Sequence, residues 1–120
     1  MSLQFESTRV GPDITIVRLL GSLVAGPEGH ALESVVLDLA GRGEKKLIFD
    51  LCGIDRIDSA GVQFVLQCFF TLRQAEGELR LASANPKVAR LLSVTRLDAL
   101  VPCYRTVTAA SASFKLERGA

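Results

Sequence analysis

Apolar positions along the chain change their spacing several times, and each change marks a predicted element. Residues 3–7 alternate apolar and polar side chains, and a turn signal at Gly11-Pro12-Asp13 separates them from a segment rich in β-branched residues. These two segments are predicted to form an antiparallel hairpin, which Gly21 ends. A nearly continuous apolar run farther on is typical of a strand buried on both faces. The predicted strands cover residues 3–7, 14–20, 46–51, 78–82 and 100–104.

Other segments space their apolar side chains three and four residues apart, which predicts helices. Pro27 opens the first helix and Gly41 stops it. The second is predicted to run from Ser59 to about Glu76, after a connection over residues 52–57. The third and fourth helices are expected to start with the caps Asn85 and Thr106, respectively.

The order of elements is therefore ββαβαβαβα. Strands that alternate with helices predict an α/β fold, with a mixed, mostly parallel sheet of about five strands carrying about four helices. The length of 120 residues fits one domain over residues 1–120.

Composition narrows the possible partners. The net charge is +1, so no basic surface points to nucleic acid or to an anionic membrane. No apolar stretch is long enough for insertion into a bilayer and no signal peptide is visible, so we expect a cytoplasmic protein. Cys52, Cys68 and Cys103 are odd in number and far apart, which predicts buried free thiols.

The sequence contains few residues or motifs that are typical of catalytic, nucleotide-binding or metal sites. His30 is the only histidine, and no metal-ligand spacing, phosphate-binding loop or nucleophile-elbow motif occurs. Asp50, Asp55 and Asp58 follow one another near the end of the central strand. A magnesium site of the receiver-domain kind would also need an acidic pair after the first strand, and residues 7–10 contain none. We therefore expect no metal and no cofactor.

The segment Asp58-Ser59-Ala60-Gly61 is the most informative, because it joins a buried strand to an apolar helix. Ser59 is expected to be the N-cap of that helix, a purely structural role. It could also be a phosphoacceptor, because a helix N-terminus offers unpaired N–H groups and positive potential to a phosphate. Gly61 would keep the turn open to a partner. Asp58 would repel a new phosphate, so modification would change binding without unfolding the chain.

At these residues the sequence resembles the STAS family, named for sulphate transporters and anti-sigma factor antagonists. The resemblance covers essentially the whole chain. It rests on the order of elements and on four segments: residues 47–51, 57–61, 77–82 and 85–98.

The resemblance implies a binding protein and not an enzyme. In the antagonist branch the serine after that aspartate is phosphorylated, which is Ser59 here. The implied partner is an anti-sigma factor that is also a serine kinase. It binds the unphosphorylated antagonist, and a phosphatase resets the phosphorylated form. ATP belongs to the kinase, so the resemblance implies no cofactor for this chain. We expect a monomer or a weak dimer.

Two positions depart from the antagonist pattern. Ala60 stands where a second hydroxyl residue is usual, which leaves Ser59 as the only acceptor there. Val24 stands where an acidic residue is often found. The partner is expected to bind loops at the edge of the sheet that carries Ser59. These loops are residues 23–26, residues 55–61 and the region around Asn85. The predicted partner-binding residues are Leu23, Val24, Asp55, Ile57, Val62, Gln63 and Asn85, with Val62 and Gln63 at the exposed start of the second helix.

Two alternative functions are compatible with the sequence. One is a STAS subunit of a stressosome-like or lipid-transport assembly, which neighbouring transporter genes would indicate. The other is a small enzyme with Ser59 or Cys52 as its nucleophile, for which a model-ester hydrolysis assay is the test.

Overall fold

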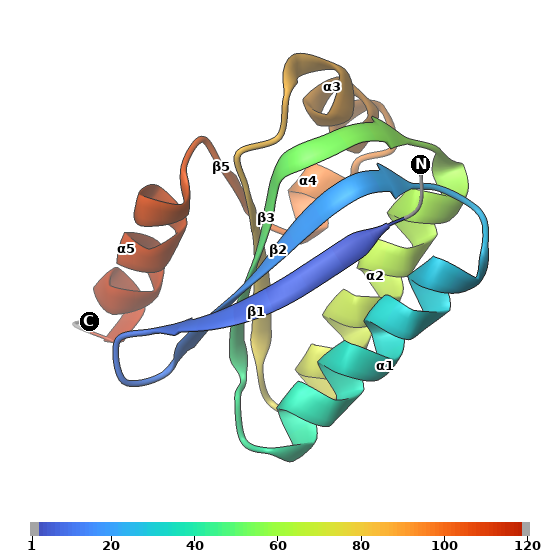
Figure 1. The fold of residues 1–120 in the computed structure, drawn as a ribbon. Helices are drawn as coiled ribbons and strands as arrows, with labels where there is room; N and C mark the ends of the chain where they lie inside the picture. The colour runs from blue at the N-terminus through green and yellow to red at the C-terminus, as the bar shows by residue number, and fades with distance from the viewer. Residues whose placement is uncertain (1–2, 119–120) are drawn as a thin grey trace.

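The computed structural model describes residues 3–118 and shows one sheet with helices on both faces (Figure 1). The strands are β1 (Gln4–Val10), β2 (Ile14–Leu23), β3 (Lys46–Ile57), β4 (Glu78–Ala82) and β5 (Cys103–Tyr104). The helices are α1 (Pro27–Gly41), α2 (Ser59–Gln74), α3 (Pro86–Val94), α4 (Leu97–Leu100) and α5 (Val107–Arg118).

The strands lie in sequence order, β1-β2-β3-β4-β5. β1 pairs antiparallel with β2, and every other pairing is parallel. The predicted hairpin and mixed, mostly parallel sheet are therefore confirmed. Parallel strands need crossover connections, which α1, α2 and α3 with α4 supply.

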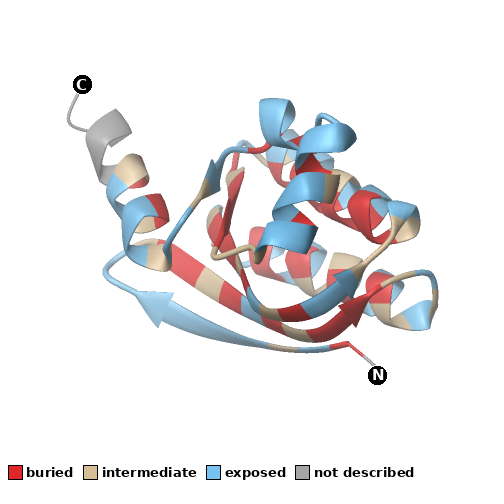
Figure 2. Cartoon of the chain, turned by 90° about the horizontal axis from the view of Figure 1, so that it is seen from above, coloured by how far each residue is buried: buried red, intermediate tan, exposed pale blue. Residues whose placement is uncertain are grey.

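Two hydrophobic clusters hold the layers together. Leu47, Phe49 and Leu51 of β3 belong to the larger cluster, which also contains the inner faces of α1 and α2. Ile48 belongs to the smaller cluster with Ala110 and Phe114 of α5. Successive side chains of a strand point to opposite faces, so β3 is buried on both sides, as its apolar run predicted. Figure 2 shows the contrast with β1, which is largely exposed.

Two strands are longer than expected. β2 continues through Gly21 to Leu23, and β3 continues to Ile57 instead of ending at Leu51. Gly21 has a φ of 102°, and the register of β2 against β3 shifts between Gly21 and Ser22. This glycine therefore forms an irregularity within the strand and does not end it. The extensions carry both strands to the edge where Ser59 lies.

The last strand of the sheet, by contrast, is shorter than predicted. Residues 97–100 form the short helix α4, and β5 covers only Cys103 and Tyr104. Leu97 is buried, so this turn of helix is held by tertiary packing. The observed order is ββαβαβααβα.

The predicted caps of α3 and α5 are confirmed. The Asn85 side chain accepts a hydrogen bond from the Val88 amide at 2.9 Å, and the Thr106 hydroxyl accepts one from the Ala109 amide at 3.0 Å. Both side chains satisfy N–H groups that have no partner within the helix.

The cysteines are free, but they are not all buried. Cys68 lies in the core, whereas Cys52 and Cys103 are exposed residues, so the prediction of burial is wrong for those two. Within residues 3–118, no helix is both long and apolar enough to cross a bilayer.

Candidate functional site

Ser59 is the first residue of α2, directly after the strand β3 and the single connecting residue Asp58. It is exposed, as predicted. Three buried residues of the following helix, Val62, Val65 and Phe69, fix α2 against the sheet. The serine is therefore presented at the rim of the sheet by an element that is firmly packed.

The N-cap of α2 is Asp58 and not Ser59, which corrects the expectation from the sequence. The Asp58 carboxylate accepts a hydrogen bond from the Gly61 amide at 2.9 Å, and its backbone is extended. Because Asp58 occupies the cap, Ser59 takes helical backbone geometry. To the groups that the structure describes, its hydroxyl makes no hydrogen bond. An exposed, uncommitted hydroxyl is the group that a modifying enzyme needs.

Asp58 also holds the β2–α1 loop, residues 24–26. Its second carboxylate oxygen accepts from the Ala25 amide at 3.3 Å. Its own amide donates to the Leu23 carbonyl oxygen, also at 3.3 Å. Asp58 thus joins the end of β2, this loop and the start of α2.

Gly61 allows these segments to approach closely. A Cβ at this position would lie 1.9 Å from the Leu23 carbonyl oxygen, far inside van der Waals contact. The sequence argument gave Gly61 a different purpose, that of leaving the turn open to a partner. In the structure the glycine serves packing between β2 and α2.

The predicted partner-binding residues separate into buried and accessible ones. Leu23 is fully buried and Val62 is only 8% exposed, so the expectation of an exposed Val62 is wrong and neither side chain offers a surface. Both belong to the larger core cluster. Ile57 is half-buried and packs against the same cluster.

The accessible members come from several elements that end or begin near this edge of the sheet. Gln63 is exposed on α2, and Val24 is half-buried in the β2–α1 loop. Asp55 is exposed on β3 and accepts a hydrogen bond from the Ser22 hydroxyl at 3.3 Å. Asn85 is half-buried, and its amide donates to the Ile54 carbonyl oxygen at 2.9 Å, which ties α3 to β3.

The backbone hydrogen bond of Ala25 is the contact of this site that the sequence analysis missed. Ala25 contributes its backbone N–H to Asp58 and exposes its side chain. Residue type does not reveal a backbone contact of this kind, because every residue except proline has the same N–H group. The only signal near it is the pair Gly26-Pro27, which marks a loop before a helix.

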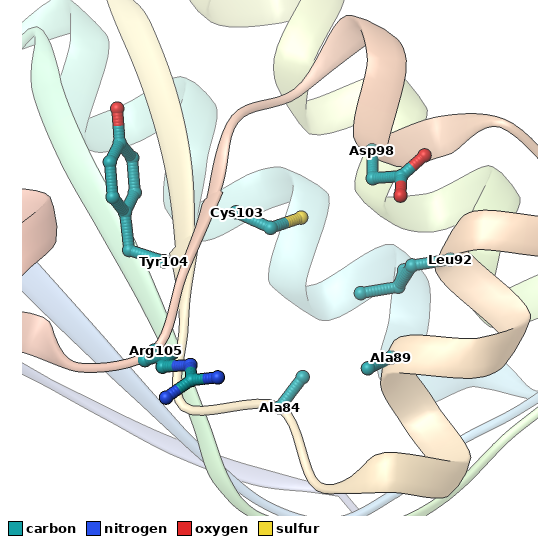
Figure 3. A pocket seen from close by; sticks show the side chains of 7 residues that line it. All are labelled: Ala84, Ala89, Leu92, Asp98, Cys103, Tyr104 and Arg105. Carbon is teal, nitrogen blue, oxygen red and sulfur yellow. The ribbon is translucent and has the colours of Figure 1, made fainter.

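A separate pocket of about 210 Å³ lies between β5 and the helices α3 and α4 (Figure 3). The Cys103 thiol points into it and Asp98 lies above. Cys103 is exposed as a residue, but the pocket walls partly desolvate its thiol. This desolvation, with a smaller effect from Asp98, raises the pKa of Cys103 to about 11, so the thiol is protonated at neutral pH. Residues 58–61 do not line this pocket, so it does not extend the Ser59 site.

The histidine and the acidic residues make structural contacts. His30 lies 3.5 Å from a Glu33 carboxylate oxygen and packs edge-on against Phe64, which places it on the α1–α2 pair. Among the side chains of residues 3–114, no three histidine, cysteine or acidic groups come together as metal ligands would. The carboxylates of Asp55 and Asp58 instead accept hydrogen bonds from the Ser22 hydroxyl and from two backbone amides.

Comparison with known proteins places this geometry in a family. A Bordetella bronchiseptica protein named "Putative anti-sigma factor antagonist BtrV" is 30% identical over 86% of this chain and 89% of its own. The anti-sigma F factor antagonist of Paenibacillus polymyxa is 27% identical over 87% and 88% of the two chains. The crystal structure of the Thermotoga maritima protein TM1081 superimposes with a TM-score of 0.82 at 27% identity, covering 91% of this chain and 92% of that one. The family model of the STAS domain matches residues 7–110, and the chain therefore belongs to the STAS family.

Proposed function

We propose that this protein is an anti-sigma factor antagonist that is switched by phosphorylation of Ser59. One observation carries the proposal: Ser59 is exposed, its hydroxyl makes no hydrogen bond within the described part of the chain, and it stands at the first position of α2 beside a fixed carboxylate. The names of the relatives from Bordetella bronchiseptica and Paenibacillus polymyxa support the same role.

The proposed partner is an anti-sigma factor that is also a serine kinase. The Ser59 oxygen attacks the γ-phosphorus of ATP held by that kinase. The bond from this phosphorus to the bridging oxygen of ADP breaks, and the hydroxyl proton passes to a base on the kinase. A phosphatase reverses the modification by transferring the phosphoryl group to water. This chain acts as substrate and binding module in both steps, in the cytoplasm and as a monomer or weak dimer.

The unphosphorylated surface around Ser59 is proposed to bind the partner. Its accessible members are Asp55 and Gln63, which are exposed, and Val24, Ile57 and Asn85, which are partly exposed. These groups come from the β2–α1 loop, the end of β3, the start of α2 and the start of α3. Side chains at the carboxyl edge of parallel strands are well placed for binding, because rigid elements hold them.

The test is phosphorylation by the anti-sigma factor kinase of the same organism. The purified kinase, Mg²⁺ and ATP are incubated with wild-type protein, Ser59→Ala and Ser59→Thr, and the sites are located by peptide mass spectrometry. Wild type should carry one phosphate, on Ser59, and Ser59→Ala none. Ser59→Thr retains a hydroxyl at the same position and should restore labelling. Phosphate on another serine of the Ser59→Ala variant would refute the proposal.

A further inference from the structure

The β2–α1 loop, residues 24–26, is attached to the start of α2 through one side chain. The Asp58 carboxylate accepts from the Gly61 amide at 2.9 Å with one oxygen and from the Ala25 amide at 3.3 Å with the other. The Asp58 amide donates to the Leu23 carbonyl oxygen. The first bond caps α2, and the second fixes the loop.

The loop has little else to fix it. Ala25 is exposed, and Gly26 has a φ of 147°, a conformation that only glycine adopts readily. The N-cap residue of α1 is Gly26, which has no side chain to cap that helix. The Asp58–Ala25 bond is therefore the polar contact that sets the position of this loop relative to Ser59.

We infer that Asp58 is a positioning residue that couples the charge on Ser59 to the conformation of the β2–α1 loop. Ser59 follows Asp58 directly, so a negative group on Ser59 adds a like charge next to a carboxylate whose two oxygens already accept hydrogen bonds. Like charges on adjacent residues repel, and the longer of the two bonds, to Ala25, is the one that lengthens. The loop then loosens, and the surface changes beyond the modified residue.

This inference deepens the proposed function, since it describes how the switch residue would alter the surface. It can be tested on the isolated protein without a kinase or a partner. Loss of the coupling would leave the phosphorylation of Ser59 untouched, and absence of phosphorylation would leave the coupling between residues 25, 58 and 59 measurable. The two ideas therefore fail separately.

Two substitutions of Asp58 separate its two bonds. Asp58→Asn retains one carbonyl oxygen, and asparagine caps helices as well as aspartate does, so the Gly61 amide stays bonded. Its amide group then faces the Ala25 N–H, where two donors meet and no bond forms. Asp58→Ala loses both bonds. Asp55→Asn removes the same charge three residues earlier, from a carboxylate that bonds Ser22 instead, and is the matched control.

The hydrogen-exchange rates of the Ala25 and Gly61 backbone amides, followed by NMR, report on the two hydrogen bonds to Asp58. In Asp58→Asn the Ala25 amide should exchange about tenfold faster than in wild type, the equivalent of one hydrogen bond, while the Gly61 amide keeps its protection. In Asp58→Ala both amides should exchange faster, and in Asp55→Asn neither should. An Ala25 amide that exchanges at the wild-type rate in Asp58→Asn would overturn the inference.

A double-mutant cycle tests the coupling itself. Ser59→Glu in the wild-type background should speed exchange of the Ala25 amide by roughly two- to fivefold, the range for repulsion between exposed like charges. In the Asp58→Asn background the same substitution should have no further effect on this amide. Equal increments in the two backgrounds would show that the charge does not act through Asp58, and the inference would fall.

Discussion

At the scale of single residues, Gly61 stands at a very close backbone contact between α2 and β2. Its position permits the start of α2 to lie against the end of β2, with no room for a side chain between them. Gly41, at the end of α1, has nothing within 4 Å of the place that a Cβ would take and shows no such constraint. The two glycines therefore differ in environment while sharing helical backbone.

We predict that Gly61→Ala destabilises the fold by about 3 kcal/mol, because the added methyl group meets backbone atoms that cannot move aside without separating α2 from β2. Urea unfolding measures the change. Gly41→Ala is the control and should be neutral or stabilising by less than about 1 kcal/mol, since alanine is the better helix former. Equal stability of the two variants would contradict the close approach at Gly61.

Cys68 supplies a second prediction, on the pH dependence of stability. Burial, with a smaller contribution from Glu33, raises the pKa of this thiol from 9.0 to about 12. Between these values the unfolded chain loses the proton and the folded chain keeps it. Stability is therefore complete below about pH 9 and falls as the pH rises toward 12, by up to about 1.4 kcal/mol per pH unit.

Chemical denaturation across pH 8 to 11 tests this for wild type and Cys68→Ala. The alanine variant should be less stable at pH 8, because it leaves a small cavity, but its stability should fall less steeply with pH. If the stability of the two proteins fell equally with pH, the pKa of Cys68 would be the same in the folded and the unfolded chain.

The sequence predicted the position of Ser59, but it did not predict the roles of Asp58 and Ala25. The position of Ser59 followed from the buried strand before it and the apolar stripe after it. The cap was assigned one residue too late, because Asp58 and Ser59 are both good caps and only the three-residue reach from Asp58 to Gly61 decides between them. The contact of Ala25 lies in the backbone and could not be predicted from residue type.

At the scale of elements, α5 stands apart from the other helices because it covers the opposite face of the sheet (Figure 1). Phe114 is 1% exposed and lies under Arg80, whose guanidinium carbon is 3.8 Å from the ring centroid. Arg80 also donates to the Ser113 hydroxyl at 2.6 Å. A buried cation stacked on an aromatic ring thus attaches α5 to β4.

We predict that Phe114→Ala releases α5 while the rest of the fold persists. The loss of a buried aromatic side chain corresponds to about 3 kcal/mol or more, so amides of α5 should exchange on the order of a hundredfold faster. Hydrogen exchange by NMR measures this against β3 amides, which should change little. Thr108→Ala truncates an exposed side chain of the same helix and should accelerate exchange in neither group. Equal acceleration in β3 and α5 would mean that α5 opens only with the whole molecule.

Element boundaries were harder to predict than element types. The apolar run in the first half of β3 was evident in the sequence. The last residues of the strand mix polar and apolar side chains, and Cys52, Asp55 and Arg56 are exposed there. Such a mixture resembles a loop in sequence, and only pairing with β2 reveals the strand. α4 has four residues, fewer than a helical periodicity needs to be visible.

At the scale of the molecule, the position of the site follows from the topology. β2 and β3 run parallel and both end at the edge where α1 and α2 begin, so the β2–α1 loop and the Asp58–Gly61 turn meet there. The sequence could predict this meeting, because it requires only the order of elements. The depth of Leu23 could not be predicted, since it is an apolar residue at the end of a strand and only the packed structure shows which way it points. Val62 begins the apolar stripe of its helix, and the structure buries it with Val65 and Phe69.

The last prediction concerns the difference between folding and binding when Ser59 becomes acidic. In the isolated protein, Ser59→Asp places a negative charge on an exposed first helical position, where the helix dipole favours it by about 0.3–1 kcal/mol and Asp58 opposes it. The free energy of unfolding should therefore change by less than about 1 kcal/mol. In a complex the same charge would be desolvated beside Asp58, at a cost of roughly several kcal/mol, which lowers affinity by orders of magnitude.

Calorimetry with the anti-sigma factor, alongside urea unfolding, measures both quantities for Ser59→Asp. Ser34→Asp adds the same charge at an exposed position in the middle of α1 and should bind like wild type, because it lies away from the edge of the sheet that carries Ser59. A large loss of affinity in Ser59→Asp alone, with both variants folded, would locate the effect in the interface and not in the net charge. Wild-type affinity in Ser59→Asp, with the fold intact, would show that Ser59 does not lie in the partner interface.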